Sequence, residues 1–376
     1  MTGMQATEQR SHVSAIVLAA GMSTRMGAIK QLVRINNKTL LENVVDNLLR
    51  SQVEDIIVVL GGSAEEIQRK LRLDHVRVVI NDAYREGMGT SLRTGLSAVN
   101  PQTEAALVVL ADQPFVKPGT LDYLIKRYRE HRPQIVIPMY KGFRGNPVLL
   151  DRSVFPELRS LTGDIGCRAI FGAHTENILK VPVDDFGVLL DIDTKDDLER
   201  LQQAHASEEC AQELLETAQD GGDSGAPQLV VVGEDAVTKA LAKFASILHF
   251  TVSIVDPFLR IADVPGADRI LHALDLARLP AAAETYVVVA SRGRCDEEAV
   301  EQALSSEMAY VALLANKKRA REIIDSLKAK GLSDEQGARL RAPAGLDIGA
   351  HSPEEIALSV MSEIVSARAK AVRNIP

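Results

Sequence analysis

Short apolar runs alternate with amphipathic stretches along the first two hundred residues. Runs rich in Val, Ile and Leu have strand-like lengths, and the segments between them repeat their apolar residues at helical spacing. The expected strands are Ser14–Leu18, Asp55–Leu60, Val76–Ile80, Ala105–Leu110, Gln134–Pro138 and Gly145–Leu150. The expected helices are Leu40–Ser51, Ala64–Leu71 with Ser63 as its cap, Thr90–Val99 and Pro118–His131. This alternation predicts a parallel sheet with helices on both faces.

The pattern starts again after an acidic, glycine-rich stretch at 205–228, which we interpret as a helix tail and a flexible linker. The expected strands beyond it are Leu229–Gly233, Thr251–Asp256, Tyr286–Ala290 and Tyr310–Leu314, with a helix at about Val237–Leu248. A final helix starts at a capping box, in which Ser352 is the cap, Pro353 follows it and Glu355 completes the motif. We therefore expect two open, Rossmann-like, three-layer αβα domains, at 1–204 and 229–376.

Composition narrows the classes of function. The chain has 376 residues, of which 46% are hydrophobic, enough for two sizeable cores. Its net charge of −8 predicts no general attraction to nucleic acid or to an anionic membrane. Aromatic residues make up 4% with no Trp, which argues against a stacking platform for bases.

The cysteines and the N-terminal region favour a cytoplasmic protein. Cys167, Cys210 and Cys295 are far apart and show no metal-ligand spacing, as is usual in a reducing compartment. Cys295 stands beside arginines, yet an ordinary thiol is favoured over a thiolate. The apolar run from Val13 to Met22 is too short to span a bilayer, so we interpret it as the first buried strand.

A loop of small residues follows that first strand and ends in basic residues. It reads Leu18-Ala19-Ala20-Gly21-Met22-Ser23-Thr24-Arg25-Met26-Gly27-Ala28-Ile29-Lys30. Small residues at 19–21 allow backbone N–H groups to approach a polyphosphate closely. Arg25 and Lys30 supply cations for the negative charge that accumulates during phosphoryl transfer. The assembled loop predicts a nucleoside triphosphate site rather than a plain turn with solvated basic residues.

Carboxylates follow two other segments and suggest a metal site. Asp112 comes directly after a buried strand, at the sheet edge where open α/β folds bind ligands, and it can hold Mg²⁺; the alternative is a cap before Pro114. Asp191 and Asp193 share one face of an extended segment, so either could be the second ligand. We favour Asp193 and keep Asp191 as the alternate, although acidic residues also stabilise a helix start without any metal.

These motifs resemble a known family over residues 13–203. The first loop is similar to the LxGGxxxRMGxxK signature of nucleotidyltransferases, and more closely to the AAGxSxRMG form of molybdenum cofactor cytidylyltransferases. The segment 87–92, Gly-Met-Gly-Thr-Ser-Leu, resembles the one that separates cytidine users from guanosine users, and the cytidine version ends in Thr-Ser. The resemblance implies catalytic roles for Arg25, Lys30 and Asp112, with Asp112 as a metal ligand. It also implies a nucleotide-binding set of Leu18, Ala19, Ala20, Gly21, Ser23, Gly27, Gly61, Asn81, Thr90 and Ser91.

Two further elements, at 144–147 and 163–168, resemble the same family and are expected to wall the acceptor side. The candidates there are Gly145, Asn146, Asp164 and Arg168, of which Arg168 could instead form a structural ion pair. The implied reaction is Mg²⁺-dependent transfer of CMP from CTP to the terminal phosphate of molybdopterin cofactor, releasing pyrophosphate. The attacking phosphate is already anionic, so this reaction needs positioning and charge neutralisation but no general base.

From residue 229 the chain resembles the C-terminal Rossmann domain of xanthine dehydrogenase maturation proteins. The match includes the segments 255–257, 265–268, 309–314 and 342–357. One motif departs from the family: only Gly233 remains of the GxGxxG loop, and Glu234 and Asp235 stand where a pyrophosphate would approach. Asp256 could hold a ribose hydroxyl, but it is more often a turn residue. Like-charge repulsion therefore argues against an NAD site.

Two alternatives to this transferase remain. The first is a non-catalytic chaperone that carries molybdenum cofactor to a dehydrogenase, and the second is a transferase acting on another phosphorylated acceptor. The complete set of Arg25, Lys30, Asp112 and Asp193 favours an enzyme, because storage does not need a site for a metal and a triphosphate. The maturation-like domain favours the pterin acceptor, with a molybdenum hydroxylase of the xanthine dehydrogenase type as partner.

Overall fold

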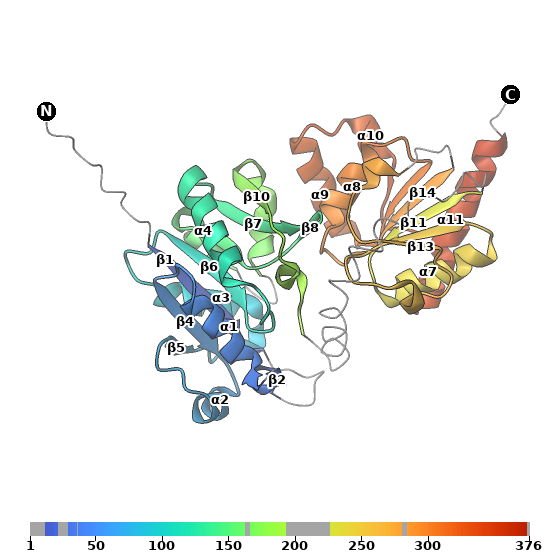
Figure 1. Ribbon diagram of the computed structural model, residues 1–376. Coiled ribbons are helices and arrows are strands. Elements are labelled where there is room, and N and C mark those ends of the chain that lie inside the picture. Colours follow the sequence, from blue (N-terminus) through green and yellow to red (C-terminus); the bar gives the residue numbers. More distant parts are fainter. Residues whose placement is uncertain are drawn as a thin grey trace, which may run out of the picture. The chain divides into compact units, whose positions relative to one another are not determined.

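The computed structural model describes residues 12–21, 29–35, 37–161, 166–192, 226–279 and 284–373 (Figure 1). These residues form two compact units: the first holds the described residues before the gap at 193–225 except Lys141–Phe143, and the second holds Lys141–Phe143 and the described residues after the gap. The predicted linker at 205–228 therefore lies almost entirely outside the described residues. None of the helices within the described ranges is long and apolar enough to cross a bilayer.

The first unit is built on one sheet with the strand order β10-β7-β9-β6-β1-β4-β5, and β8 pairs with β7. All neighbours on the main path are parallel except β9, which runs antiparallel to both β6 and β7. The connection from β7 to β9 is too short for a parallel crossover, which explains the reversal that the sequence pattern did not predict. The strands are β1 Val13–Ala19, β4 Asp55–Leu60, β5 Arg77–Ile80, β6 Ala105–Leu110, β7 Ile135–Tyr140, β8 Phe143–Arg144, β9 Val148–Asp151 and β10 Ile178–Pro182.

Helices cover both faces of this sheet, as predicted. Val13, Ala15 and Val17 of β1 pack in a cluster with α1 and α4, whereas Ile16 packs in a second cluster with α3 and α5. This alternation follows from the two-residue period of a strand. The helices are α1 Leu40–Leu49, α2 Ala64–Lys70, α3 Met88–Ala98, α4 Pro118–His131 and α5 Phe155–Arg159, and a small hairpin of β2 Arg34–Ile35 and β3 Lys38–Thr39 precedes α1.

Helix starts were predicted with mixed success. Ser63 stands at the N-cap of α2 before an acidic first turn, as predicted, but its side chain makes no capping hydrogen bond. Its φ of −102° and ψ of 15° lie outside the extended region that a cap residue usually adopts. The Ser352–Glu355 capping box is confirmed: the Glu355 amide donates to Ser352 Oγ at 3.2 Å, and the Ser352 amide donates to Glu355 Oε2 at 2.9 Å.

The second unit contains a fully parallel sheet with the order β13-β12-β11-β14-β15-β16. This is the order 3-2-1-4-5-6 of dinucleotide-binding folds, whose ligand crevice opens between the first and fourth strands, here β11 and β14. The predicted Rossmann-like architecture is therefore confirmed in this unit. The strands are β11 Gln228–Val232, β12 Thr251–Val255, β13 Arg269–Leu271, β14 Thr285–Val289, β15 Tyr310–Leu313 and β16 Leu340–Arg341.

Five helices in the described part of this unit flank its sheet. Helices α7 and α11 pack on one face, where Val237 and Leu241 of α7 and Val360 and Ile364 of α11 share a core with Leu229. Helix α8 contacts β14, β15 and α9. The helices are α7 Ala236–Ile247, α8 Asp296–Leu304, α9 Lys317–Ala329, α10 Asp334–Ala338 and α11 Pro353–Arg373.

Candidate functional site

Four parallel strands of the first unit end at the same edge of the sheet. Leu18 is paired with Leu110, and Leu60 is paired with both Ala19 and Ile80. The residues that follow these strands are Ala20 and Gly21, Gly61, Asn81, and Ala111 with Asp112. Strand pairing thus brings to one edge candidate site residues that lie up to about ninety residues apart in the sequence. Open α/β sheets bind their ligands at this edge.

Lys30 and Asp112 meet at this edge. Lys30 begins the short 3₁₀ helix η1 Lys30–Leu32, and its Nζ lies 2.5 Å from Asp112 Oδ2. Both side chains are mostly buried, with 14% and 25% of their surface exposed. Coulomb attraction between partly buried charges exceeds that on an open surface, so the pair fixes the Lys30 ammonium beside the Asp112 carboxylate. A candidate cation for phosphate and a candidate metal ligand are therefore held together.

The other oxygen of Asp112 fits the predicted metal. Asp112 Oδ1 is buried and has no hydrogen-bond partner among the described residues, although buried carboxylate oxygens usually have one. A divalent cation such as Mg²⁺ takes oxygen ligands of this kind. Helix α4 begins after Lys117, so Asp112 is not the cap of this helix. No cluster of three His, Cys, Asp or Glu side chains suited to a metal occurs within the described ranges.

Gln113 connects Asp191 to the end of β6 and was missed from the sequence. Its Nε2 donates to Asp191 Oδ1 at 2.7 Å and to the Val188 carbonyl at 3.3 Å, and its side chain is buried. The Ile192 amide also donates to the Asp112 carbonyl at 3.0 Å. The alternate metal ligand Asp191 is thus tied to the residue after Asp112.

The first loop is anchored by Gln31, which was also missed. Its buried amide donates to the Ala19 carbonyl at 2.7 Å and to the Gly21 carbonyl at 3.4 Å. Gly61 packs under the same loop, where an added Cβ would lie 2.6 Å from the Ala20 carbonyl oxygen. Gln31 carries no specific sequence signal, because a buried amide side chain serves many purposes.

The predicted nucleotide-binding polar residues after β5 form a buried network of their own. Asn81 Nδ2 donates to Thr90 Oγ1 at 2.8 Å and to Ser91 Oγ at 2.9 Å. Thr90 Oγ1 lies 3.0 Å from the Ala83 carbonyl and 2.9 Å from that of Gly87, both of which can accept its proton. Asn81 therefore fixes the first turn of α3, which carries the Thr-Ser pair of the predicted specificity segment.

The acceptor-side candidates fall in separate places. Gly145 is buried against Val188, where an added Cβ would lie 2.5 Å from a Val188 methyl carbon, and the Asn146 amide donates to the Val188 carbonyl at 2.8 Å. Arg168 is exposed near the start of the 3₁₀ segment η4 Cys167–Asn177. Gly166 lies against Met88, so this segment adjoins the start of α3. The predicted site residues Ser23, Arg25, Gly27, Asp164 and Asp193 lie outside the described residues.

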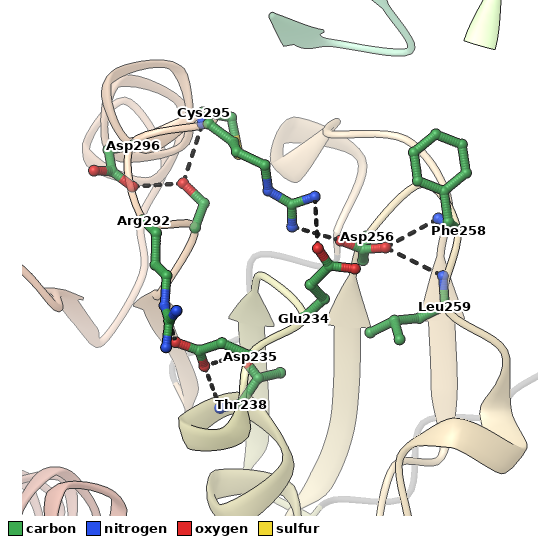
Figure 2. Close-up of polar contacts among 11 residues, drawn as sticks. Glu234, Asp235, Thr238, Asp256, Phe258, Leu259, Arg292, Cys295 and Asp296 are labelled. Atoms are coloured by element: carbon green, nitrogen blue, oxygen red, sulfur yellow. Dashed lines mark hydrogen bonds and ion pairs between the residues drawn. The ribbon is translucent and has the colours of Figure 1, made fainter. Parts of the chain in front are cut away.

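The candidates of the second unit follow β11 and β12, at the sheet edge where dinucleotide-binding folds have their ligand crevice; Figure 2 shows Asp256 and its polar contacts. Gly233 follows β11 with a φ of +138°, and Asp256 follows β12 with no exposed surface. Asp256 Oδ1 accepts hydrogen bonds from the Phe258 and Leu259 amides at 3.0 and 3.1 Å, as expected of a turn residue. Glu234 and Asp235 do not stand as open like charges, because each pairs with an arginine.

Comparisons with known proteins agree with this division. Residues 15–178 match the MobA-like NTP transferase domain, and residues 229–364 match the XdhC Rossmann domain. A probable molybdenum cofactor guanylyltransferase of Methanosarcina mazei is 30% identical over 158 residues, which cover 40% of this chain and 69% of that protein. The chain belongs to the MobA-like NTP transferase family. It is therefore related to nucleotidyltransferases of molybdenum cofactor biosynthesis, as the sequence motifs predicted.

Other relatives show how broad this family is. The molybdenum cofactor cytidylyltransferase of Escherichia coli K12 is 27% identical over 190 residues, covering 50% of this chain and 94% of that enzyme. Nicotine blue oxidoreductase of Paenarthrobacter nicotinovorans is 28% identical over 198 residues, covering 50% and 96%. Escherichia coli YqeB is 31% identical over 152 residues, but these cover 39% of this chain and only 28% of YqeB.

Among solved structures, Rv0371C of Mycobacterium tuberculosis in complex with manganese is 31% identical. It has a TM-score of 0.45 and covers 51% of this chain and 98% of that one.

Proposed function

We propose that this chain transfers CMP from CTP to the terminal phosphate of molybdopterin cofactor, forming molybdopterin cytosine dinucleotide and pyrophosphate. The observation that carries this proposal is the Lys30–Asp112 pair, which lies where four strands end and whose Asp112 Oδ1 is buried with no hydrogen-bond partner among the residues that the structure describes. A cation beside a free carboxylate oxygen is an arrangement suited to a triphosphate with its metal.

The residues of the chain would act by positioning and by charge. Backbone N–H groups at 19–21, held by Gln31, would face the phosphates, and Lys30 would neutralise charge on the departing pyrophosphate. Mg²⁺, held by Asp112 with Asp193 or Asp191, would supply Lewis-acid neutralisation of the triphosphate. Arg25 completes the proposed catalytic set. The acceptor phosphate needs no base, because it is anionic before it attacks.

The choice of CTP rests on two features. The Thr90-Ser91 pair resembles the cytidine version of the specificity segment, and its hydroxyls are held in place by Asn81. The Escherichia coli cytidylyltransferase is similar over nearly its whole length. We expect these hydroxyls to set the position of the α3 start against the base, with Gly145, Asn146, Asp164 and Arg168 on the acceptor side.

The second unit suggests the destination of the product. Its match to the XdhC Rossmann domain supports a molybdenum hydroxylase of the xanthine dehydrogenase type as the recipient. We propose the division into 1–204, a linker at 205–228 and 229–376. Limited proteolysis that cuts first within 205–228 would support this division, and a first cut elsewhere would contradict it.

The direct test is pyrophosphate release by the full chain with Mg²⁺, purified molybdopterin cofactor and each of CTP, GTP, ATP and UTP. We expect release with CTP and the dinucleotide product by mass spectrometry. Preference for GTP would overturn the cytidine assignment and keep the transferase. Cofactor binding without release from any nucleotide would favour the chaperone, and release only with another phosphorylated acceptor would change the substrate class.

A further inference from the structure

The crevice of the second unit has the strand order of a dinucleotide site, so its residues can be compared with what such a ligand needs. In these folds the pyrophosphate lies at the N-terminus of the helix after the first strand, and a carboxylate after the second strand accepts ribose hydroxyls. The corresponding places here are the start of α7 and Asp256. Both are engaged by other parts of the chain.

Both carboxylate oxygens of Asp256 are already engaged by the chain. Its Oδ1 accepts from two backbone amides, and its Oδ2 lies 2.9 Å from Nη2 of Arg294. The carboxylate has no exposed surface. Separating this buried ion pair to admit a sugar hydroxyl would leave a charge without its partner, which is costly in a protein interior.

The start of α7 is occupied by Asp235. Its Oδ1 accepts from the Thr238 amide at 2.9 Å, which uses one of the N–H groups that an incoming phosphate would need. Its Oδ2 lies 2.9 Å from Nε of Arg292. The chain therefore supplies its own carboxylate at the helix end where the fold family places a phosphate.

Arg294, from the loop after β14, pairs with two carboxylates that follow β11 and β12. Its Nη1 lies 3.0 Å from Glu234 Oε1, and its Nη2 lies 2.9 Å from Asp256 Oδ2. Burial disfavours the charged form of Arg294, but Glu234 and Asp256 outweigh it and raise its pKa above the usual value. Glu234 is 38% exposed whereas Asp256 is fully buried, so Glu234 is the more easily exchanged partner.

Gly233 has a structural reason that involves no ligand. An added Cβ would lie 2.4 Å from the Ala290 carbonyl oxygen, and the φ of +138° is one that other residues rarely adopt. The close approach of the loops after β11 and β14 requires this glycine. Its survival from the family motif is therefore no sign of dinucleotide binding.

We propose that this crevice is a self-occupied nucleotide site, in which Glu234 takes the place of a ligand phosphate on Arg294 and so determines that the chain rejects dinucleotides. Removal of the Glu234 carboxylate would leave Nη1 of Arg294 available to a ligand phosphate. Arginine binds phosphate through charge-assisted hydrogen bonds, so the variant should accept a phosphate ester that the wild type excludes.

The test uses the full chain with saturating CTP and Mg²⁺, so that the first unit is filled, and follows NADH by its own fluorescence. We expect no saturable binding by the wild type up to about 1 mM. Glu234→Gly should bind NADH saturably, with a Kd at least about tenfold below this 1 mM limit. Glu234→Gln, which keeps the side-chain size, should gain binding in the same direction. The double variant Glu234→Gly with Arg294→Met should lose it.

Glu322→Gln is the matched control, because Glu322 also pairs with an arginine, Arg319, but on helix α9. It should behave as the wild type, and CTP-dependent pyrophosphate release should be unchanged in Glu234→Gly. Saturable micromolar binding of NADH by the wild type would overturn the proposal. The proposal would also be overturned if both Glu234 variants melt as the wild type does, and are therefore folded, but show no gain of NADH binding.

Discussion

Lys30 and Asp112 stand 82 residues apart in the sequence, and their side chains form an ion pair of 2.5 Å. The pair joins the end of the first loop to the end of β6, and Asp112 Oδ1 stays buried with no hydrogen-bond partner in the described part of the chain. Two groups proposed to handle opposite charges, the triphosphate and its metal, are thereby fixed relative to each other before any ligand is bound.

Loss of either member of this pair should slow the proposed reaction severely. Lys30→Ala or Asp112→Asn should reduce CTP-dependent pyrophosphate release by about 10²–10³-fold, the scale for losing one preorganised charge contact. The matched control is Lys70→Ala, since Lys70 forms an exposed ion pair with Glu66 on α2. Equal rates for wild type, Lys30→Ala and Asp112→Asn would show that this pair is not part of the active site.

Two glycines at the same sheet edge should respond differently to an added methyl group. Gly61→Ala should destabilise the first unit by about 1–3 kcal/mol, because its Cβ would overlap the Ala20 carbonyl. Gly21→Ala has open space and should melt as the wild type does. If residue 21 faces the phosphates, Gly21→Ala should still raise the KM for CTP. An unchanged KM in Gly21→Ala would show that phosphate does not approach this residue.

Gln113 should act on the metal through Asp191. Gln113→Met removes the hydrogen bond to Asp191 while keeping the side-chain length, and we expect the KM for Mg²⁺ to rise about tenfold. Titration of the initial rate with Mg²⁺ measures this effect. Gln68→Met, an exposed change on α2, is the control. A lower melting temperature with an unchanged KM for Mg²⁺ would mean that Gln113 is structural and that Asp191 is not a ligand.

The Cys295 thiol should make the stability of the second unit depend on alkaline pH. Burial raises its pKa from 9.0 to about 12, against smaller opposing effects of Ser291 and Arg294. Below pH 9 the thiol is protonated in both the folded and the unfolded state, so its contribution is fully present. Between pH 9 and about 12 only the unfolded thiol ionises, and stability falls by about 1.4 kcal/mol per pH unit.

Urea unfolding of the wild type and of Cys295→Ala from pH 8 to 10.5 measures this contribution. The free energy of unfolding of the second unit should fall more steeply in the wild type, and other alkaline groups cancel in the difference. Parallel curves for the two proteins would contradict a buried neutral thiol. The ordinary thiol favoured by the sequence agrees with the raised pKa.

Strong periodic segments were predictable from the sequence, and long-range pairings were not. β4 and β6 begin and end where the apolar runs do, because Val, Ile and Leu buried on both faces leave a continuous signal. β10 was missed, because it lies at the sheet edge and has only one fully buried residue, Val181. β9 was found with the wrong direction, since its pairing depends on connection length rather than on composition.

The same limit applies to the candidate sites. Lys30 and Asp112 could be predicted one by one, because each stands at a strand or loop end with a charge. Gln31 and Gln113 could not, since a buried amide has no distinctive neighbours in the sequence. Glu234 was expected to repel a phosphate by its charge, but the structure places that charge against Arg294, sixty residues further along the chain. The exclusion of NAD that we propose therefore rests on this ion pair and not on open like charges.

The short turn η1 holds the two described ends of the first loop together. The chain leaves the sheet at Gly21, and Gln31 ties both Ala19 and Gly21 to the turn from which Lys30 reaches Asp112. The described residues on either side of 22–28 are therefore joined to each other through the Gln31 side chain. We expect that replacing residues 22–28 by the loop of another family member of equal length changes the choice of nucleotide. The sheet of the first unit and Asp112 should stay in place.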